Sequence, residues 1–382
     1  MARRVLTLLG AAMTLTASAV VNQAPASAAP PSWAAVPVCP GPAAPGTARC
    51  HSWMLPKAAS TTPSGLSPAT IKDVYSFPTG STPGQGQTIA IVDAYDDPTA
   101  ANDLAVFSTQ FGLPDCTTAT GCFTKVNQQG GSKLPRANAG WALEISLDIE
   151  WAHAIAPGAK ILLVEANSAN FSDLTTAEVY ANTHASYVSN SWGGSEFSGE
   201  TSDDAYFSHT GVSTFVAAGD AGLPAEYPSS SPNVISVGGT TLNFSHGTFS
   251  SETGWSKGGG GCSSYEKATT AQSGFSGYAH VSCNGYRATP DVALDADPQS
   301  GVSVYDSTKY QGRSGWEVVG GTSAATPMWA ARSADSGSVV NAALVYGTSI
   351  TYRDITVGNN GAPCLVGFDL CSGRGSWVGA KP

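Results

Sequence analysis

Thr88-Ile89-Ala90-Ile91-Val92-Asp93 is an apolar run, rich in β-branched residues, that ends in an acidic residue. Further runs of this kind follow along the chain, at residues 160–164, 187–191, 213–218 and 234–237. The stretches between them are long enough for crossover helices. Strands that are buried on both faces and alternate with helices are typical of parallel sheets. The sequence therefore predicts an α/β fold with a mainly parallel sheet flanked by helices.

Polar or aromatic residues follow three of these runs. Asp93 ends the first run, Trp192 follows the third and Asp220 follows the fourth. Because substrates bind at the carboxyl ends of parallel strands, we expect these three side chains to converge. The sequence thus indicates where the chemistry of this protein takes place.

A helix is predicted from Trp141 to the stop signal at Pro157. Its apolar positions recur at helical spacing and comprise Ile145, Ile149, Ala152 and Ala156. Glu144 and Asp148 lie one turn apart on a face beside this apolar stripe. Two like charges at that spacing destabilise a helix unless the carboxyl groups share a proton or a hydrogen bond. Such sharing would raise the pKa of one of them, which suits a general base or acid in acidic surroundings.

The same two carboxyl groups have a simpler explanation, in which both are solvated on an exposed face of the helix. On this feature alone the sequence leaves both interpretations open. Glu150 lies on another face, and we expect it to be an ordinary solvated carboxylate.

Ser323 stands in Gly320-Gly321-Thr322-Ser323, where a tight glycine turn leads into small residues suited to a helix. This placement exposes a hydroxyl near a helix N-terminus, where free N–H groups and the helix dipole favour developing negative charge. Ser323 is therefore a candidate nucleophile. The alternative is a serine that only caps the helix.

Asp220 follows an apolar strand in Gly219-Asp220-Ala221-Gly222. A carboxyl group held protonated there could donate a hydrogen bond to an oxyanion, which implies operation in acid. A turn-forming aspartate is the alternative.

The composition excludes several classes of protein. The chain has 18 basic and 28 acidic residues and a net charge of -10, so it lacks the cationic surface that nucleic-acid binding needs. Its 43 Gly, 24 Pro and 12% charged residues are typical of a loop-rich globular protein. Beyond the N-terminus, no stretch approaches the roughly 20 apolar residues of a membrane span.

Residues 1–28 have the pattern of a secretory signal peptide. Arg3 and Arg4 precede an apolar run that is followed by Ala26-Ser27-Ala28, a small-residue cleavage pattern. A membrane anchor is the alternative, which the Thr, Ser and Gly residues within the run oppose. We therefore expect the protein to be secreted, with no membrane attachment after the signal is cleaved.

The next segment, residues 29–62, is rich in Ala, Pro, Ser and Thr and lacks an apolar period. It is predicted to be a mature extension or a short pro-segment. Regular structure is expected to begin near Ser67, which precedes Pro68 at the first position of a helix. Residues 63–382 are then predicted to form one large domain.

Eight cysteines occur in couples that are close in sequence: Cys39 and Cys50, Cys116 and Cys122, Cys262 and Cys283, and Cys364 and Cys371. An even number of cysteines in an exported chain predicts disulfides, here local ones, although the sequence does not fix the pairing. A zinc site is the alternative, but the sequence has no Cys-x-x-Cys pair with histidines at ligand spacing.

Taken together, these motifs resemble those of the sedolisin family, the serine-carboxyl peptidases, over roughly residues 65–376. The resemblance implies a subtilisin-like three-layer fold. It also implies a secreted endopeptidase, monomeric and active in acid, that hydrolyses polypeptides through an acyl-enzyme.

The resemblance gives each motif a role. Ser323 corresponds to the nucleophile, Glu144 to its general base, and Asp148 to the residue that orients and tunes Glu144. Asp220 corresponds to the family's oxyanion aspartate. Asp93, at a position where some relatives extend the carboxylate network with a Glu, and Trp192 are implied as supporting residues.

The family also carries a calcium site near its C-terminus, built from an Asp, a backbone carbonyl and a glycine-rich loop. Residues that are similar to this pattern comprise Asp354, Ile355, Leu365, Gly367 and Asp369. Hard oxygen ligands of this kind suit Ca²⁺. Leu365 stands where the first loop glycine is expected, a change that a carbonyl ligand tolerates.

The chain departs from the family pattern in two places. Family members are usually made with a long folded prodomain, whereas only some 35 residues separate the predicted signal from the catalytic region here. The chain also looks shortened after Ser323. A buried helix should follow the nucleophile, and residues 331–338 are expected to be a poor continuation of that helix.

Two rival interpretations remain. A subtilisin-type Asp-His-Ser peptidase would need a histidine base between Asp93 and Ser323, and neither His153 nor His246 fits that requirement. A secreted homologue that keeps the fold without turnover and acts as a binding protein is the other. It is opposed by the presence of all the expected chemical groups.

Overall fold

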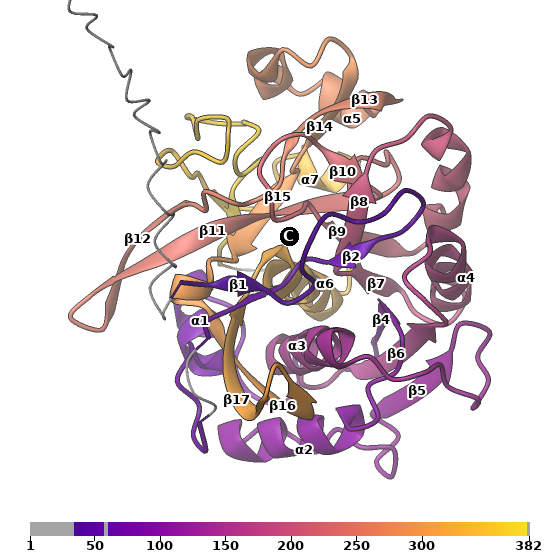
Figure 1. Ribbon diagram of the computed structural model, residues 1–382. Helices are drawn as coiled ribbons and strands as arrows, with labels where there is room; N and C mark the ends of the chain where they lie inside the picture. Colours follow the sequence, from indigo (N-terminus) through magenta and orange to yellow (C-terminus); the bar gives the residue numbers. More distant parts are fainter. Residues whose placement is uncertain (1–33, 57–59, 380–382) are drawn as a thin grey trace, which may run out of the picture. The chain divides into compact units, whose positions relative to one another are not determined.

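A sheet of ten strands forms the centre of the described part of this computed structural model, residues 34–56 and 60–379 (Figure 1). Its hydrogen-bonded neighbours follow the order β18-β19-β15-β11-β9-β7-β4-β6-β5, and β12 pairs with β11. The bounds are β4 (Thr88–Ala94), β5 (Phe123–Asn127), β6 (Lys160–Ala166), β7 (Tyr187–Asn190), β9 (Ser213–Ala217), β11 (Ile235–Ser245), β12 (Thr248–Gly254), β15 (Val292–Asp295), β18 (Tyr352–Arg353) and β19 (Ser376–Trp377). Every pairing from β5 to β19 is parallel, which confirms the predicted sheet. The predicted signal peptide, residues 1–28, lies outside the described ranges.

The middle strands are buried on both faces. In β4 every residue after Thr88 is buried, and in β9 all five residues are. Removing apolar side chains from water contributes about 25 cal/mol per Å² of buried apolar area. Strands with two buried faces therefore consist of continuous apolar runs, and this is why the sequence revealed them.

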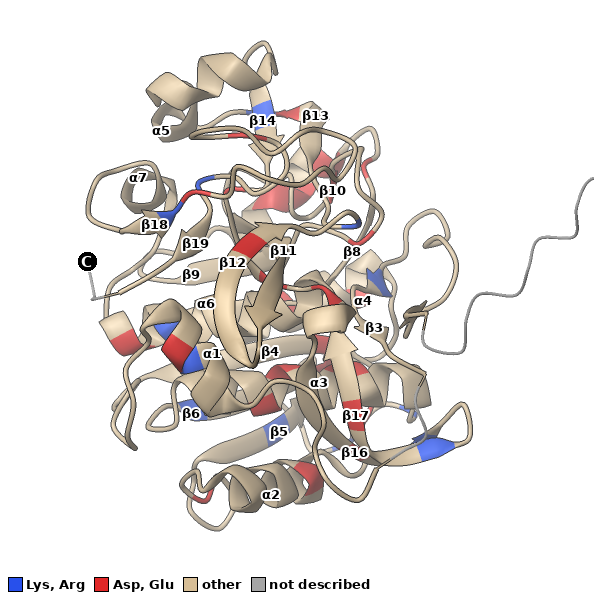
Figure 2. Ribbon diagram, turned by 90° about the vertical axis from the view of Figure 1, so that its left-hand side faces the viewer, with Lys and Arg blue, Asp and Glu red and all other residues tan. Residues whose placement is uncertain are grey.

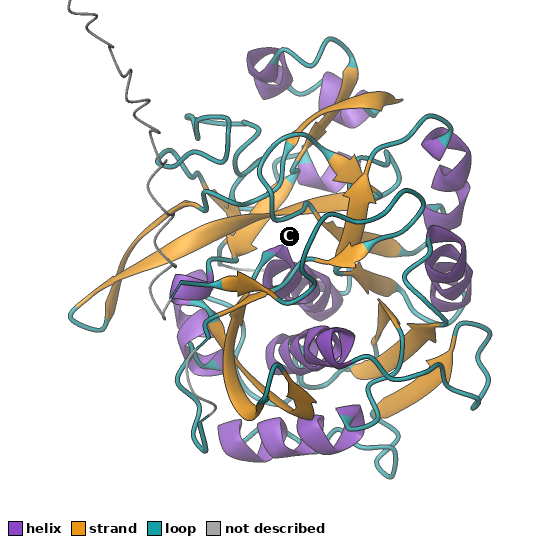
Figure 3. Ribbon diagram, viewed as in Figure 1, coloured by secondary structure: helices purple, strands orange, loops and turns teal. Residues whose placement is uncertain are grey.

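Helices cover the sheet on both sides (Figure 3). α3 and α6 contact each other on one side of β4 and β7, and α4 contacts β4, β6 and β7 from the other side. The bounds are α1 (Pro68–Tyr75), α2 (Ala100–Phe111), α3 (Ala139–Ile155), α4 (Phe171–Asn182), α5 (Thr270–Ser273), α6 (Thr322–Ser336) and α7 (Ala342–Val345), with 3₁₀ helices η1 (Glu200–Phe207), η2 (Ser276–Val281) and η3 (Pro298–Ser300). Within the described residues, none of these helices is both long and apolar enough to cross a membrane.

α3 begins where Asn138 accepts two backbone N–H bonds of the first turn. All its residues after Ala139 are buried, because it contacts the sheet, α2, α6 and β16 (Val302–Tyr310) together. The expectation that Glu150 is solvated is therefore wrong. Its carboxyl group is buried and accepts a hydrogen bond from the Tyr305 N–H at 3.0 Å.

Three short strands precede the first helix: β1 (Val36–Pro37), β2 (Arg49–Cys50) and β3 (Trp53–Met54). The expectation that regular structure begins near Ser67 is therefore wrong, although Ser67 does cap α1. β2 pairs with β8 (Trp192–Ser195), and β3 pairs with β17 (Arg313–Gly320), the strand that leads into α6. Two-residue strands leave no period in a sequence, so only their distant partners reveal them. Figure 1 shows this indigo segment crossing in front of α6.

α6 is an unbroken helix of 15 residues, so the expectation that residues 331–338 continue it poorly is wrong. Arg332, which lies on this stretch, is fully buried and pairs with Asp335 at 2.6 Å. Its guanidinium also lies 4.5 Å from the ring centroid of Trp377. A buried charge with both an ionic and an aromatic partner is tolerated, and the helix behind Ser323 stays packed.

All eight cysteines form the predicted local disulfides: Cys39–Cys50, Cys116–Cys122, Cys262–Cys283 and Cys364–Cys371. The zinc alternative is therefore wrong for these residues, because a disulfide sulfur is not a thiolate ligand.

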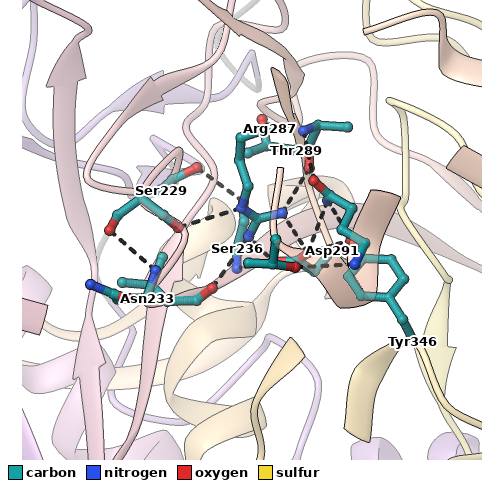
Figure 4. Close-up of polar contacts among 12 residues, drawn as sticks. Ser229, Asn233, Ser236, Arg287, Thr289, Asp291 and Tyr346 are labelled. Atoms are coloured by element: carbon teal, nitrogen blue, oxygen red, sulfur yellow. Dashed lines mark hydrogen bonds and ion pairs between the residues drawn. The ribbon is translucent and has the colours of Figure 1, made fainter. Parts of the chain in front are cut away.

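A buried ion pair joins Arg287 of β14 (Tyr286–Thr289) to Asp291 (Figure 4). Asp291 also accepts hydrogen bonds from the Tyr346 hydroxyl and from the Ser236 N–H of β11, the latter at 2.7 Å. Arg287 donates to the Val234 carbonyl at 3.2 Å. Because every charged atom in it has partners, this network ties α7 and β14 to the sheet. β14 pairs with β13 (Gly261–Lys267).

Candidate active site

Ser323 lies in the first turn of α6, directly after the glycine turn that follows β17. It is fully buried, and its Oγ donates to the Ser191 carbonyl oxygen at 3.3 Å. Its N–H donates to the His51 carbonyl oxygen at 3.1 Å. Gly321 has a φ of +100°, and a Cβ there would stand 2.0 Å from that same oxygen, so only glycine fits this turn.

Glu144 and Asp148 of α3 are fully buried, so the interpretation that both are solvated is wrong. Burial raises the pKa of Glu144 to about 8, while the nearby hydroxyls of Ser323 and Ser52 lower it and the charge of Asp220 raises it. Neither Glu144 oxygen has a hydrogen bond from another described residue. Ser323 thus lies next to Glu144, but the Ser323 hydroxyl donates to the Ser191 carbonyl oxygen instead.

Two further carboxyl groups extend this cluster toward the sheet. Burial raises the pKa of Asp148 well above its usual range, and the charges of Asp93 and Glu144 raise it further. The pKa of Asp93 in β4 is likewise raised well above its usual range, by burial and by the charges of Glu144 and Glu165. Such neighbours cannot all be ionised, so they share protons. Figure 2 shows acidic residues in red on α3.

Glu165 is a member of this cluster that the sequence analysis did not select. It lies opposite Asp93 in the pairing of β4 with β6, and burial raises its pKa to about 9. The signal was available, because Glu165 follows the second apolar run as Asp93 ends the first.

Trp192 is fully buried at the start of β8, and its indole Nε1 donates to the Val92 carbonyl oxygen at 2.9 Å. This bond places the indole next to the strand end that carries Asp93. Asp93 lies near the end of β4, and Trp192 and Asp220 lie just beyond β7 and β9, so the three residues stand at the same edge of three neighbouring strands.

Asp220 lies at the end of β9, opposite the start of α6. Its Oδ1 accepts both the N–H of Thr322 at 2.9 Å and the Thr322 hydroxyl at 2.8 Å. Burial raises the pKa of Asp220 to about 6, against the lowering effects of His51, Thr322 and Arg49. Its Oδ2 is buried, has no hydrogen bond to any described residue, and lies 2.8 Å from where a Gly321 Cβ would stand.

The N-terminal segment fills the space above Ser323 with residues that the sequence analysis did not select. His51 is buried, and its N–H donates to the Ser191 carbonyl oxygen at 3.1 Å. Its Nε2 lies 3.2 Å from Glu226 Oε2 in β10 (Glu226–Tyr227), whose other oxygen is 3.8 Å from Arg49. In the sequence, the pair Cys39 and Cys50 was the one indication that this segment forms a folded loop.

The histidines do not supply a base for Ser323. His51 faces Glu226, His153 hydrogen-bonds the Pro114 carbonyl at 2.9 Å, and His246 contacts Ser245. Among the described residues no histidine ring hydrogen-bonds Ser323. This geometry gives no support to an Asp-His-Ser triad.

Comparison with known proteins identifies the family. The model of the subtilase family matches residues 136–355, more than half of the chain. The chain belongs to the subtilase family. This subtilase is 32% identical to kumamolisin of Bacillus sp. over 372 residues and 30% identical to xanthomonalisin of Xanthomonas sp. over 357 residues. It is also 36% identical to sedolisin of Pseudomonas sp. over 181 residues.

These relatives are longer proteins. The matches cover 84%, 72% and 41% of this subtilase but 64%, 41% and 29% of the respective relatives. Among solved structures, Pseudomonas sedolisin, a serine-carboxyl proteinase, matches with a TM-score of 0.69 and 28% identity, over 83% of this chain and 96% of that one. Sphericase matches at 0.54 and 19% identity, over 85% of this chain and 100% of that one, which supports the fold alone. The predicted resemblance to the sedolisin family and the subtilisin-like fold are confirmed.

The predicted calcium residues of this subtilase lie around one loop. Asp354 accepts the Gly367 N–H at 2.8 Å, and Asp369 accepts the Leu365 N–H at 2.6 Å through its Oδ2. The other oxygen of Asp369 already accepts three donors from Cys371 and Ser372. Asp354 and the Oδ2 of Asp369 each accept a hydrogen bond from a loop N–H and keep lone pairs of the kind that a hard cation binds.

A second acidic group lies elsewhere, where Asp97, Asp103 and Asp306 bring carboxylate oxygens within 4.8 Å of one another. Thr99 and Thr308 hydroxyls already donate to this group, at 3.0 and 3.3 Å to Asp97. It is the competing location for a cation in this subtilase.

Proposed function

We propose that this chain is a secreted serine-carboxyl endopeptidase that cleaves polypeptides in acid through an acyl-enzyme on Ser323. The observation that carries the proposal is that Ser323 lies beside two buried carboxyl groups, those of Glu144 and Asp220. Glu144 adjoins the Ser323 hydroxyl, and the Ser323 N–H and Asp220 adjoin the position that an oxyanion would take. Nucleophile, base and oxyanion donor are the parts that acyl transfer needs.

In the proposed reaction Ser323 Oγ attacks the substrate carbonyl carbon while its proton passes to Glu144. Protonated Asp220 and the Ser323 N–H donate to the oxyanion. Glu144 then gives the proton to the leaving amine, and water hydrolyses the acyl-enzyme by the same steps in reverse. Asp148 and Asp93 are proposed as positioning residues, because they lie in the same buried carboxyl cluster as Glu144, whose charge raises the pKa of both.

Secretion and domain limits belong to the same proposal. The disulfides suit an oxidising compartment. Residues 1–28 would be removed as a signal, and residues 63–382 would form the peptidase domain, acting as a monomer. Trp192 would support the end of the strand that carries Asp93.

Activity on an unfolded protein or peptide should fall as the pH rises through about 6, where Asp220 loses the proton it donates, and at lower pH it should be limited by the fraction of Glu144 that is ionised. An assay of the purified protein from pH 3 to 8, with Ser323→Ala beside it, measures this. Asp220→Asn keeps an N–H donor that does not titrate, so its activity should persist above pH 6 at a reduced maximum. A peak above neutrality in the wild type, or no activity that depends on Ser323, would contradict the proposal.

We further propose one structural Ca²⁺ held by Asp354, Asp369 and carbonyls of Ile355, Leu365 and Gly367. A ligand that binds only the folded state stabilises it, by about 2.7 kcal/mol at 100 times its Kd. Chelation by EDTA should therefore lower Tm by about 5 °C or more, measured by calorimetry.

Two matched variants locate the ion. Asp354→Asn should remove the response of Tm to EDTA, whereas Asp306→Asn, in the second acidic group, should keep it. An unchanged Tm, or a response that disappears only in Asp306→Asn, would exclude calcium from the Asp354 loop.

A further inference from the structure

Residues 258–261 are four consecutive glycines, which we call the glycine strip. All four are buried, although they lie in the connection between β12 and β13 and at the start of β13. Glycine loses more conformational freedom on folding than any other residue, so a buried run of this kind is unfavourable unless close packing requires it. The strip therefore marks a place where other main chains approach closely.

One side of the glycine strip faces the Asp220 loop, residues 218–222. The Gly259 N–H donates to the Gly219 carbonyl oxygen at 2.6 Å, and the Gly260 N–H donates to the Gly222 carbonyl oxygen at 3.3 Å. These two bonds hold the main chain on either side of Asp220. The position of the Asp220 carboxyl group therefore depends on the position of the strip.

The other side of the glycine strip faces the C-terminal loop, residues 357–371. Asn360 of this loop is 4% exposed, and its Nδ2 donates to the Gly258 carbonyl oxygen at 2.8 Å and to the Leu370 carbonyl oxygen at 3.0 Å. A Cβ on Gly260 would stand 2.2 Å from that Leu370 oxygen. The strip is thus packed between the two loops, and the Asn360 amide joins it to the C-terminal loop.

Asn360 is held in one orientation. Its Oδ1 accepts the Ala362 N–H at 3.1 Å, and its own N–H donates to the Ala362 carbonyl oxygen at 3.2 Å. Both N–H groups of the amide and its oxygen are therefore in use. Because a buried polar group without a partner is unfavourable, the side chain cannot turn away from Gly258 without loss.

The main chain that the strip holds is also bonded to the helix of the nucleophile. The Gly219 N–H donates to the Thr322 hydroxyl at 3.2 Å, and Asp220 Oδ1 accepts the Thr322 N–H at 2.9 Å. Thr322 directly precedes Ser323. The other oxygen, Oδ2 of Asp220, is buried and has no hydrogen bond to a described residue, so it is the oxygen that can donate to an oxyanion when protonated.

We propose that Asn360 is a positioning residue, which acts through the glycine strip to hold the Asp220 carboxyl group where an oxyanion forms on the substrate. This inference rests on the proposed peptidase function. An oxyanion donor stabilises the transition state only if it is already in place when the charge develops. A displacement of about 1 Å can lower the rate about 100-fold, even when it starts far from the reacting atoms. The C-terminal loop is then part of what makes the enzyme fast.

Asn360→Ala tests this role by removing the amide that joins the strip to the C-terminal loop. Steady-state assays on a peptide should show that kcat falls about 30-fold while KM changes less than about threefold, because the oxyanion exists only in the transition state. Calorimetry on the same preparations confirms that the assay temperature lies well below Tm. A folded variant with the kcat of the wild type would overturn the positioning role.

Asn359→Ala is the matched control. Asn359 is the neighbouring asparagine, it is exposed, and its Oδ1 accepts the Gly361 N–H of the same loop at 2.7 Å. This change removes a hydrogen bond within the loop without touching the strip, so kcat should stay within about twofold of the wild type. A loss as large as that of Asn360→Ala would show that any disturbance of the loop has this effect, and would overturn the specific role of Asn360.

Two inhibitors distinguish positioning from general loosening of the site. A peptide aldehyde forms a tetrahedral adduct with a serine nucleophile, whereas the matching peptide alcohol binds without a covalent bond. In Asn360→Ala the inhibition constant of the aldehyde should rise by about the factor by which kcat/KM falls, and that of the alcohol should not change. Equal weakening of both inhibitors would overturn the proposal.

Asn360→Asp decides the question if Asn360→Ala does not fold. It keeps the shape of the side chain and, when protonated, one donor in place of two, so kcat should fall about fivefold in acid at an unchanged KM. Gly259→Ala reaches the same main chain from the strip, because its Cβ would stand 2.0 Å from the Ala218 carbonyl oxygen, and should also lower kcat more than KM.

The outcomes separate this inference from the peptidase function. Hydrolysis that depends on Ser323 in the wild type, together with wild-type kcat in the folded Asn360→Asp form, would overturn the positioning role and leave the peptidase function standing. A wild type without hydrolysis that depends on Ser323 would overturn the peptidase function itself, and with it the inference.

Discussion

Replacing Ser323 by alanine and Glu144 by glutamine should each lower kcat about 10⁴-fold, because each change removes half of one proton-transfer unit. The double variant should lose little more than either single one. Steady-state assays on an acid-unfolded protein, with the four forms side by side, measure this cycle. The same preparations should keep the Tm of the wild type to within a few degrees, since Ser323→Ala removes only one hydrogen bond of 3.3 Å to the Ser191 carbonyl, which also accepts the His51 N–H, and the Glu144 oxygens accept none from the described residues.

Matched variants separate chemistry from packing. Ser333→Ala removes another buried hydroxyl of α6, which donates to the Trp329 carbonyl at 2.8 Å. Glu150→Gln changes another buried carboxyl group of α3. Both should keep kcat close to the wild-type value. Losses that simply multiply in the Ser323 and Glu144 double variant would show that the two residues do not act together.

Thermal stability should be greatest in acid. Burial raises the pKa of Glu178 to about 8, of Glu165 to about 9 and of Asp306 to about 8, well above those of the unfolded chain. A carboxyl group with a raised folded-state pKa stabilises the fold fully below its unfolded pKa, near 4 to 4.5, and loses that contribution as the pH rises through the folded value. Several such groups act together, so Tm should fall by about 5 to 10 °C between pH 4.5 and pH 8.5.

Differential scanning calorimetry across this range, on the Ser323→Ala form to avoid self-digestion, provides the measurement. Glu178→Gln, on α4 on the other side of the sheet from α6, should reduce the difference in Tm, whereas Asp73→Asn on the exposed side of α1 should not. A Tm that rises from pH 4.5 to pH 8.5 would contradict the assignment of protons to these buried groups.

The predictable parts of the fold are those in which burial requires a regular pattern of apolar residues or a local signal marks the end of a helix. The β4 and β9 runs are apolar because water reaches neither face, and the cap at Ser67 and the stop at Pro157 mark helix ends locally. Glu144 and Asp148 were selected by their spacing on one helix face, Asp220 by its place after an apolar strand and Ser323 by the glycine turn before a helix, and all four matched a known set of motifs.

The parts that were missed depend on distant partners. Glu150 was expected in water because one apolar stripe predicts one buried face, yet α3 packs against other elements on every side. Residues 331–338 were expected to continue the helix poorly, yet Arg332 is buried there against Asp335 and against Trp377, which lies 45 residues further along the chain. His51 and Glu226 are 175 residues apart in the numbering, and nothing local links them.

The disulfide Cys39–Cys50 closes a loop between β1 and β2, the strand that pairs with β8 at Trp192. A disulfide stabilises a fold mainly by restricting the unfolded chain, so its reduction would raise the entropy that is lost when β2 is held in place. The segment that crosses Ser323 should therefore loosen under reducing conditions, and the access of a peptide to the nucleophile would then depend on the redox poise of the surroundings.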